Sequence, residues 1–139
     1  MNRASFCLGM VAIALAGCVP PPPVAIVGPA QVIEVFFDLG STQLNTQALA
    51  AIDYATVAAG RRPLMAPVEV VGHADAIGGQ QTNAAISQAR AQVVAGALVQ
   101  EGVARGRIIL RAAGENLPVV ATRPDEREPR NRRVEIIIR

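Results

Sequence analysis

Residues 68–102 read VEVVGHADAIGGQQTNAAISQARAQVVAGALVQEG, and they describe a strand, a glycine break and a long helix. Val68 to His73 is a short apolar run rich in β-branched residues, which predicts a strand. Gly78 and Gly79 interrupt the chain. From Asn83 onward apolar residues recur at helical spacing, and the predicted helix stops at Gly102, a typical residue just past a helix C-terminus. A strand followed by a helix is the unit from which α/β domains are built.

Arg90 lies in the apolar stripe of this predicted helix. The stripe consists of Ile86, Ala89, Val93, Val94, Ala97 and Leu98. At ~100° per residue, Arg90 falls between Val93 and Val94 on the helical wheel. A guanidinium on a core-facing stripe is costly unless it meets a carboxylate. Asp75 ends the preceding strand, so either Asp75 neutralises Arg90 internally or both charges line a pocket for a ligand.

The rest of the chain also alternates strands with helices. Residues 32–37 predict a first strand that runs into Asp38, because Ile33, Val35 and Phe37 would share one face and Val32, Glu34 and Phe36 the other. Thr46 can cap a helix through about Ala59, whose buried face would use Leu49 and Ile52. Two more strands are predicted over residues 107–112 and 133–139. This order predicts a two-layer α/β sandwich with helices packed on a sheet.

The composition suits one domain and excludes several classes of function. The 139 residues are 51% hydrophobic but only 3% aromatic, which predicts an aliphatic core. The formal charge of +2 provides no strong basic footprint for nucleic acid. One histidine and no usable cysteine pair make a metal site improbable, and no cofactor is expected.

The first seventeen residues read as an export signal. Arg3 precedes an apolar run from Ala4 to Ala16, shorter than the roughly twenty residues that a membrane-spanning helix needs. Residues 15–18, Leu-Ala-Gly-Cys, resemble a bacterial lipobox, which implies cleavage before Cys18 and lipidation of that cysteine. The alternative is an ordinary secretory signal with an incidental cysteine. Because Cys7 lies in the presumed signal, no disulfide is expected in the mature domain.

Residues 18–30 read as a tether between the lipidated Cys18 and the domain at residues 31–139. Pro20 to Pro23 fix φ and remove hydrogen-bond donors, so this segment should be extended. At ~3.1 Å per residue it would span some 35 Å.

A spaced set of residues resembles the C-terminal domain of OmpA-like proteins, which include the peptidoglycan-associated lipoproteins. The resemblance covers about Gln31 to Arg139. It implies a β-α-β-α-β-β fold with a mixed four-stranded sheet and helices on one face. It also implies a periplasmic domain that binds peptidoglycan non-covalently through the diaminopimelate of its peptide stems. The matching positions are Gly72-His73-Ala74-Asp75, Gly78, Asn83, Ile86-Ser87, Arg90-Ala91 and Asn131-Arg132-Arg133-Val134-Glu135-Ile136.

The same resemblance assigns roles to the candidate site. Diaminopimelate presents an ammonium and a carboxylate on one carbon. In the family, the residues matching Asp75 and Arg90 are the main ligand contacts, an acceptor for the ammonium and a bidentate grip on the carboxylate. The residue matching Asn83 assists them. The other candidate positions are Phe37 and Asp38 in a pocket wall, Ala74 where the family usually has Thr, and Asn131 and Arg132 of the Asn-Arg-Arg motif. Thr82 stands where an aromatic is common.

Several of these residues also have a purely structural interpretation, and Phe37 taken alone would more often be a core residue. Asp75 and Arg90 could form an internal salt bridge, and Asn83 could be a helix cap. His73 is more often a satisfied strand-end histidine than a catalyst. For Arg127 and Arg130 a solvated basic turn is the preferred interpretation.

Three functions remain to be compared. The first is a lipoprotein of the outer membrane whose domain faces the periplasm and holds the cell wall. The second is an interaction module of an envelope assembly, with other envelope proteins as partners and wall binding secondary. The third is a wall hydrolase using Ser41, His73 and Asp75 as a triad. We expect no enzyme, because the chain has no Gly-x-Ser-x-Gly elbow and no second histidine for zinc.

Overall fold

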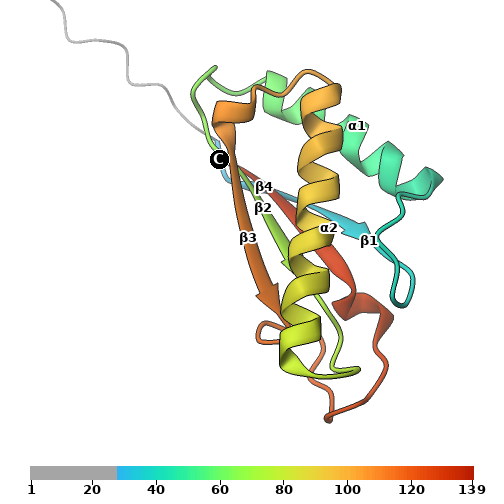
Figure 1. Ribbon diagram of the computed structural model, residues 1–139. Coiled ribbons are helices and arrows are strands. Elements are labelled where there is room, and N and C mark those ends of the chain that lie inside the picture. Colours follow the sequence, from blue (N-terminus) through green and yellow to red (C-terminus); the bar gives the residue numbers. More distant parts are fainter. Residues whose placement is uncertain (1–27) are drawn as a thin grey trace, which may run out of the picture.

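The computed structural model describes residues 28–139, and the predicted signal, Cys18 and most of the tether lie outside these residues. Figure 1 shows one sheet with two helices packed on the same face. The elements follow in the order β1 (Gln31–Phe36), α1 (Thr46–Gly60), β2 (Val68–His73), α2 (Gln80–Gln100), η1 (Arg105–Arg107), β3 (Ile108–Gly114), η2 (Pro129–Asn131) and β4 (Arg133–Ile138). This confirms the two-layer α/β architecture and the β-α-β-α-β-β order.

The sheet is mixed, with strand order β1-β4-β2-β3. Strand β4 is antiparallel to both of its neighbours, whereas β2 and β3 are parallel. The helix α2 connects the parallel pair, because a parallel connection needs a crossover that packs on the sheet.

The core lies between the sheet and the helices and is aliphatic. Alternate residues of the strands face it, since successive side chains of a strand point to opposite faces. Helix α1 contributes Ile52 and a row of alanines, which lets the helix lie close to the sheet. The fully buried aliphatic side chains include Val35, Val68, Val70, Val134, Ile136 and Ile138 from the strands and Ile52, Val94 and Leu98 from the helices.

Three sequence-based expectations about the helices are wrong in detail. The cap of α1 is Asn45, whose side chain accepts a hydrogen bond from the backbone N–H of Ala48 at 2.8 Å, so Thr46 is the first helical residue. Leu49 is 48% exposed because the adjacent Ala48 faces the sheet instead. On α2, Val93 is 36% exposed, and the buried stripe passes through Ser87, Arg90 and Val94.

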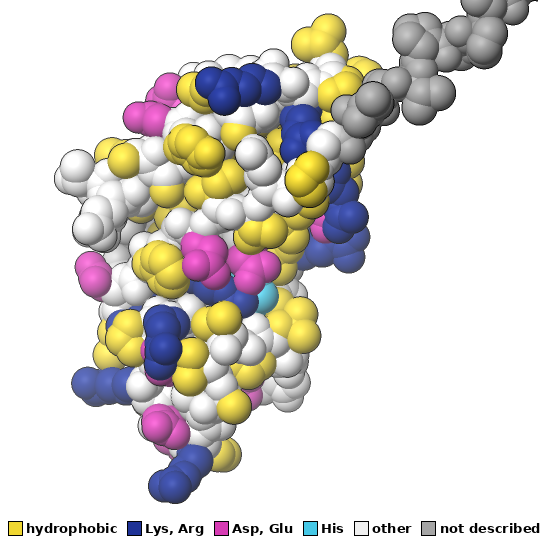
Figure 2. Space-filling model, turned by 180° about the vertical axis from the view of Figure 1, so that it is seen from behind, with side chains coloured by type: hydrophobic (Ala, Val, Ile, Leu, Met, Phe, Trp, Pro, Cys, Tyr) yellow, Lys and Arg dark blue, Asp and Glu magenta, His cyan; other side chains and the backbone are white. Residues whose placement is uncertain are grey.

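The face of the sheet that the helices leave uncovered carries a cluster of charged side chains, gathered in the middle of the view in Figure 2. Arg133 approaches Glu34 to 3.4 Å and donates to Glu135. His73 is 2% exposed, and its Nε2 lies 3.6 Å from Glu135. The expectation of a satisfied histidine is wrong, because neither ring nitrogen has a hydrogen-bond partner among the described residues.

The strand register defines two ends of the domain. At one end, which we call the tether end, Gln31, Ile138, Val68 and Ile108 lie in one row. Residues 28–30, the 61–67 loop, η1 and Arg139 continue from this row. The opposite end, which we call the site end, carries the segments that follow β1, β2 and β3 and the one that precedes β4.

Candidate functional site

Arg90 projects from the buried face of α2 at the site end and is 1% exposed. Its guanidinium donates to three backbone carbonyls: Nε to Ser41 at 3.0 Å, Nη1 to His73 at 3.2 Å and Nη2 to Asp38 at 3.1 Å. These carbonyls belong to the end of β2 and to the loop after β1. Arg90 therefore ties that loop to the strand and to the helix.

The charge of Arg90 is held among neutral groups and one aromatic ring. Its guanidinium carbon lies 5.3 Å from the centre of the Phe37 ring, within the range of a cation–π contact. Burial lowers the pKa of Arg90; the nearby Asp75 opposes this effect and Arg132 adds to it. Since arginine is not deprotonated in proteins, the side chain stays charged at neutral pH.

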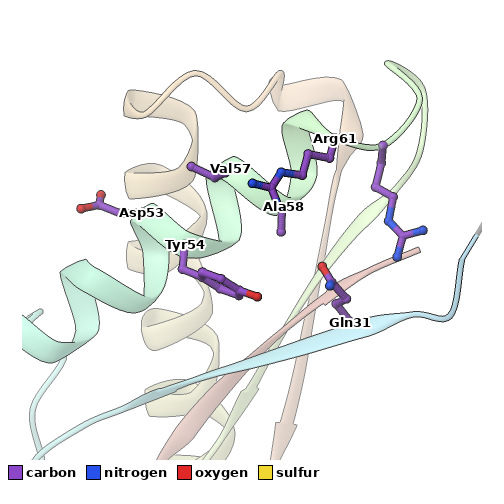
Figure 3. Close-up of a pocket in the computed structure, with 7 residues that line it drawn as sticks. Gln31, Asp53, Tyr54, Val57, Ala58 and Arg61 are labelled. Carbon is purple, nitrogen blue, oxygen red and sulfur yellow. The ribbon is translucent and has the colours of Figure 1, made fainter.

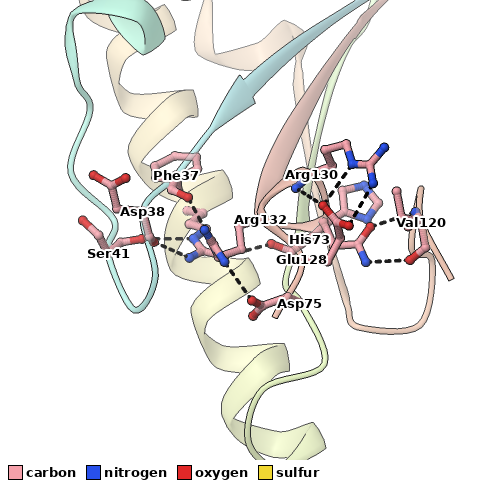
Figure 4. A network of polar contacts seen from close by, with 11 residues as sticks. Phe37, Asp38, Ser41, His73, Asp75, Val120, Glu128, Arg130 and Arg132 are labelled. Atoms are coloured by element: carbon pink, nitrogen blue, oxygen red, sulfur yellow. Dashed lines mark hydrogen bonds and ion pairs between the residues drawn. The ribbon is translucent and has the colours of Figure 1, made fainter. Parts of the chain in front are cut away.

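Asp75 is 5% exposed and forms its ion pair with Arg132. The distance from Arg132 Nη1 to Asp75 Oδ2 is 3.1 Å, and the same guanidinium donates through Nε to the carbonyl of Phe37 at 3.2 Å. Figure 4 shows Arg132 between Phe37 and Asp75. Of the two arginines, Arg132 is thus the one that Asp75 contacts directly, and Arg90 is satisfied by carbonyls.

Asn83 and Asn131 bind loops rather than the Asp75–Arg132 pair. The side-chain amide of Asn83, in the first turn of α2, donates to Glu115. The cap of α2 is Gly79, so the interpretation of Asn83 as a plain helix cap is wrong. Asn131 is 1% exposed and holds Val119 and Val120 with three hydrogen bonds of 2.8–3.0 Å.

Ala74 continues the backbone from β2 towards Asp75. Its N–H donates to the carbonyl of Gly114 at 2.8 Å, so the end of β3 fixes the direction of the chain just before Asp75. The side chain is 3% exposed and carries no hydroxyl that could brace the carboxylate.

An open groove of about 390 Å³ lies beside these residues. Phe37, Asp38 and Arg132 line it, together with Phe36, Asn45, Gln47, Pro129 and Arg130. Arg90 reaches the groove wall from beneath through its contacts with Phe37 and Asp38. The site end therefore has a solvent-open part around Arg132 and a buried part around Arg90.

Sequence reasoning missed Ser41 and Glu115 as partners in these networks. Ser41 acts through its carbonyl and Glu115 through a contact with a residue 32 positions away. Neither contact depends on a residue type that a local pattern would single out. Arg130 forms an exposed pair with Glu128, and Arg127 is exposed, as the solvated-turn interpretation expects.

The residues of the imagined hydrolase triad do not assemble. Ser41 Oγ accepts the N–H of Gln43 at 3.0 Å, and His73 lies next to Glu135 on the uncovered face of the sheet. Within residues 28–139 no group of three histidine, cysteine or acidic side chains is arranged to hold a metal ion. No helix in the described part of the chain has the length and apolar character needed to cross a membrane.

The curated relatives of the chain include an outer membrane protein and a probable lipoprotein. The chain is 36% identical to an outer membrane protein of Gluconacetobacter diazotrophicus over 116 residues, which cover 79% of the chain and 30% of the relative. It is 39% identical over 71 residues to the probable lipoprotein YiaD of Escherichia coli, covering 51% of the chain and 32% of that protein. The chain thus matches about a third of the length of these two relatives.

Solved structures with the same fold include the peptidoglycan-associated lipoprotein of Burkholderia pseudomallei. Its TM-score is 0.70 at 24% identity, with 77% of this chain and 90% of that chain covered. The C-terminal domain of Helicobacter pylori MotB, residues 125–256, gives a TM-score of 0.65 at 23% identity and covers 76% of this chain and 81% of that chain. The fold has therefore been crystallised as an isolated domain. Residues 36–132 match the OmpA family. Since this match spans well over half of the sequence, the chain belongs to the OmpA family.

Proposed function

We propose that this protein is a lipoprotein of the outer membrane whose domain faces the periplasm and binds peptidoglycan non-covalently, through the diaminopimelate of the peptide stems. The observation that carries the proposal is the Asp75–Arg132 ion pair beside an open groove, with Arg90 directly behind the groove wall. Membership of the OmpA family and the likeness to a peptidoglycan-associated lipoprotein support it. Lipidation at Cys18 would supply the membrane anchor, with the tether of residues 18–30 between the anchor and the domain.

The Asp75–Arg132 pair suits a zwitterionic ligand because the ligand can replace each partner of the pair with a group of the same charge. A ligand ammonium can replace Arg132 at the Asp75 carboxylate, and a ligand carboxylate can replace Asp75 at Arg132. Each charge then keeps an opposite partner, so ligand entry leaves no buried charge unpaired. Arg132, whose side chain is 12% exposed, is positioned to make the first contact.

Arg90 can add a second grip on the ligand carboxylate. A guanidinium has five N–H donors, and the three carbonyls of Ser41, His73 and Asp38 use three of them. One N–H on each terminal nitrogen remains for a bidentate carboxylate. Because Arg90 is 1% exposed, this contact requires the loop around Asp38 to move outward.

Co-sedimentation with purified peptidoglycan tests the proposal. We expect the domain to be retained on walls that contain diaminopimelate and to be released by the free amino acid. Asp75→Asn and Arg132→Gln should each weaken retention about tenfold or more, since each removes a charge-assisted contact worth about 1.5–3 kcal/mol. Arg127→Gln is the matched control, because Arg127 is an exposed arginine of the same segment that does not line the groove.

Circular dichroism of each variant separates loss of binding from loss of folding. If folded Asp75→Asn and Arg132→Gln proteins sediment as well as the unsubstituted domain, the charged residues of the site end are not the wall-binding site.

A second function, an interaction module of an envelope assembly, is favoured by the likeness to MotB. Its periplasmic fragments match with TM-scores of 0.65–0.66, close to that of the lipoprotein. In this case, crosslinking in cells should recover one envelope protein in stoichiometric amounts, and Asp75→Asn should leave that complex intact. If Asp75→Asn abolishes both the complex and wall binding, the result favours the first function.

A further inference from the structure

The 61–67 loop, between α1 and β2, presents two large apolar side chains to solvent at the tether end. Leu64 is 85% exposed and Met65 is 87% exposed, more than any other large apolar side chain within the described residues. The loop connects the helix to the strand through Pro63 and Pro67. Neighbouring apolar side chains this exposed commonly mark a contact with a partner or a membrane.

The loop is held in shape although its apolar side chains point outward. The N–H of Ala66 donates to the carbonyl of Pro63 at 2.8 Å and closes a turn around Leu64 and Met65. Arg107 of η1 donates to the carbonyls of Ala66 at 2.7 Å and Ala59 at 3.0 Å. These contacts fix the loop against η1 and α1, so the two side chains are presented on an ordered turn.

Arginines surround this apolar turn. Arg61 and Arg62 precede it, and Arg105 and Arg107 lie in the η1 segment that packs against it. The acidic side chains near this end are Glu69, which Arg111 and Arg139 engage at 3.5 and 2.9 Å, the exposed Glu101 after α2, and the exposed Asp53 of α1. The arginines of this end outnumber these acids. Two exposed apolar side chains surrounded by arginines match the chemistry of an anionic phospholipid surface. The phosphates of such a surface attract arginine, and its acyl region accepts Leu and Met.

The side of α1 next to the loop extends the same surface. Tyr54 is 60% exposed and Val57 is 55% exposed, and with Arg61 they line a groove of about 470 Å³ beside Gln31 (Figure 3). Tyrosine is favoured at a membrane interface because its ring is apolar and its hydroxyl is polar.

The chain leaves the domain at this same end. Arg62 donates to the carbonyls of Gly28 at 3.1 Å and Pro29 at 2.6 Å, so the first described residues lie against the loop. We propose that the tether end docks on an anionic phospholipid bilayer, with Leu64 and Met65 inserted among the headgroups and Arg61 and Arg105 against the phosphates. The contact is additional to the proposed lipid at Cys18 and is testable without it.

Vesicle flotation with residues 28–139 tests this contact, since the OmpA-family match at residues 36–132 lies within them. We expect binding to vesicles of phosphatidylglycerol and phosphatidylcholine, little binding to phosphatidylcholine alone, and release by salt. Leu64→Asp with Met65→Asp should weaken binding at least tenfold. Arg61→Gln should weaken it about fivefold, the contribution of one arginine near an anionic surface.

The matched control is Leu117→Asp with Val119→Asp, two apolar residues that are 62% and 56% exposed in the segment after β3 at the site end. This variant should bind vesicles like the unsubstituted domain. Equal binding of the Leu64/Met65 variant, or no binding of the unsubstituted domain, would overturn the proposal. A self-association that the Leu64/Met65 substitutions abolish, without vesicle binding, would assign the loop to a protein contact instead. Peptidoglycan retention should be unchanged in the Leu64/Met65 variant, so this proposal and the proposed function can fail separately.

Discussion

At the scale of single residues, Arg90 combines a structural role with the role proposed in binding. Its three carbonyl contacts join the loop after β1, the end of β2 and helix α2, segments separated by up to 52 residues. A lysine has a single ammonium and cannot reproduce three bonds in the fixed geometry of a guanidinium. Arg90 should therefore matter for folding even when no ligand is present.

Arg90→Met should lower the free energy of unfolding by about 2–4 kcal/mol, because it leaves three carbonyls of Asp38, Ser41 and His73 without their donor. Urea denaturation of the isolated domain measures this change. Arg130→Met removes an exposed arginine and should leave the unfolding midpoint unchanged. A stable Arg90→Met domain would mean that Arg90 serves ligand binding alone.

His73 should make stability depend on pH. Burial lowers the pKa of His73 from its ordinary value of 6.5; Arg133 adds to the effect and Glu135 opposes it. The unfolded chain then takes up the proton more readily than the folded chain, so stability is full above about pH 6.5 and falls as the pH decreases from there. Thermal unfolding of the unsubstituted domain and of His73→Gln between about pH 5 and 8 checks this. The variant should show a flatter profile below pH 6.5, and identical slopes would exclude His73 as the cause.

At the scale of elements, the site is positioned by the tight packing of α2 on β2 at Gly72. A Cβ added at Gly72 would lie 1.9 Å from the backbone oxygen of Ser87, one turn before Arg90. Ser87 is fully buried, donates to the carbonyl of Ala84 and accepts the N–H of Gly114 at 3.1 Å. Only glycine lets the helix lie this close to β2, and this closeness allows Arg90 to reach the His73 carbonyl.

Gly72→Ala should destabilise the domain by about 3 kcal/mol, near the upper end of overpacking costs, because the obstructing atom is backbone and cannot rotate away. It should also weaken peptidoglycan retention, since α2 must move. Gly96→Ala is the control: no atom lies within 4 Å of its added Cβ, and alanine favours a helix by about 1 kcal/mol over glycine. Calorimetry of both variants compares them. A harmless Gly72→Ala substitution would contradict the close packing of β2 and α2.

At the scale of the whole molecule, the two proposed contacts lie at opposite ends of the sheet. The strands β1, β2 and β4 have six residues each, which at ~3.3 Å per residue places the ends about 20 Å apart. The tether end would face the membrane and the site end the wall (Figure 1). In this arrangement one domain can contact the membrane and the cell wall at the same time without large movements.

Shortening the tether should therefore reduce the distance that the domain can reach from the membrane, without changing its affinity for peptidoglycan. Deletion of Pro20–Pro23 removes four residues of the expected tether, about 12 Å at the ~3.1 Å per residue of polyproline II. We expect weaker crosslinking of the protein to the wall in intact cells, while the isolated domain sediments with purified peptidoglycan as before. A chain lengthened by four residues at the same point should crosslink normally. Undiminished crosslinking of the shortened protein would argue against a tether that limits reach.

Local sequence patterns are sufficient to predict the strands and helices and the buried position of Arg90. The apolar run rich in β-branched residues predicted strand β2 residue for residue. The same run also placed Asp75 just past β2. Helical spacing placed Arg90 on the buried face of α2, because it assigns each side chain to a face. These properties depend on residues close together in the chain. The same periodicity placed Leu49 and Val93 in the core incorrectly, since Ala48 faces the sheet beside Leu49 and Val94 faces it beside Val93.

The pairing of the charged side chains follows from the packing of segments that are far apart in the sequence. Arg132 contacts Asp75 across 57 residues and Phe37 across 95 residues, and Asn83 bonds to Glu115 from another loop. Such pairings depend on how the loops pack at the end of the sheet, and an opposite charge nearby in sequence carries no information about that packing. Arg90 can dispense with a direct carboxylate because three carbonyls converge on it, and that convergence exists only once β1, β2 and α2 are packed together.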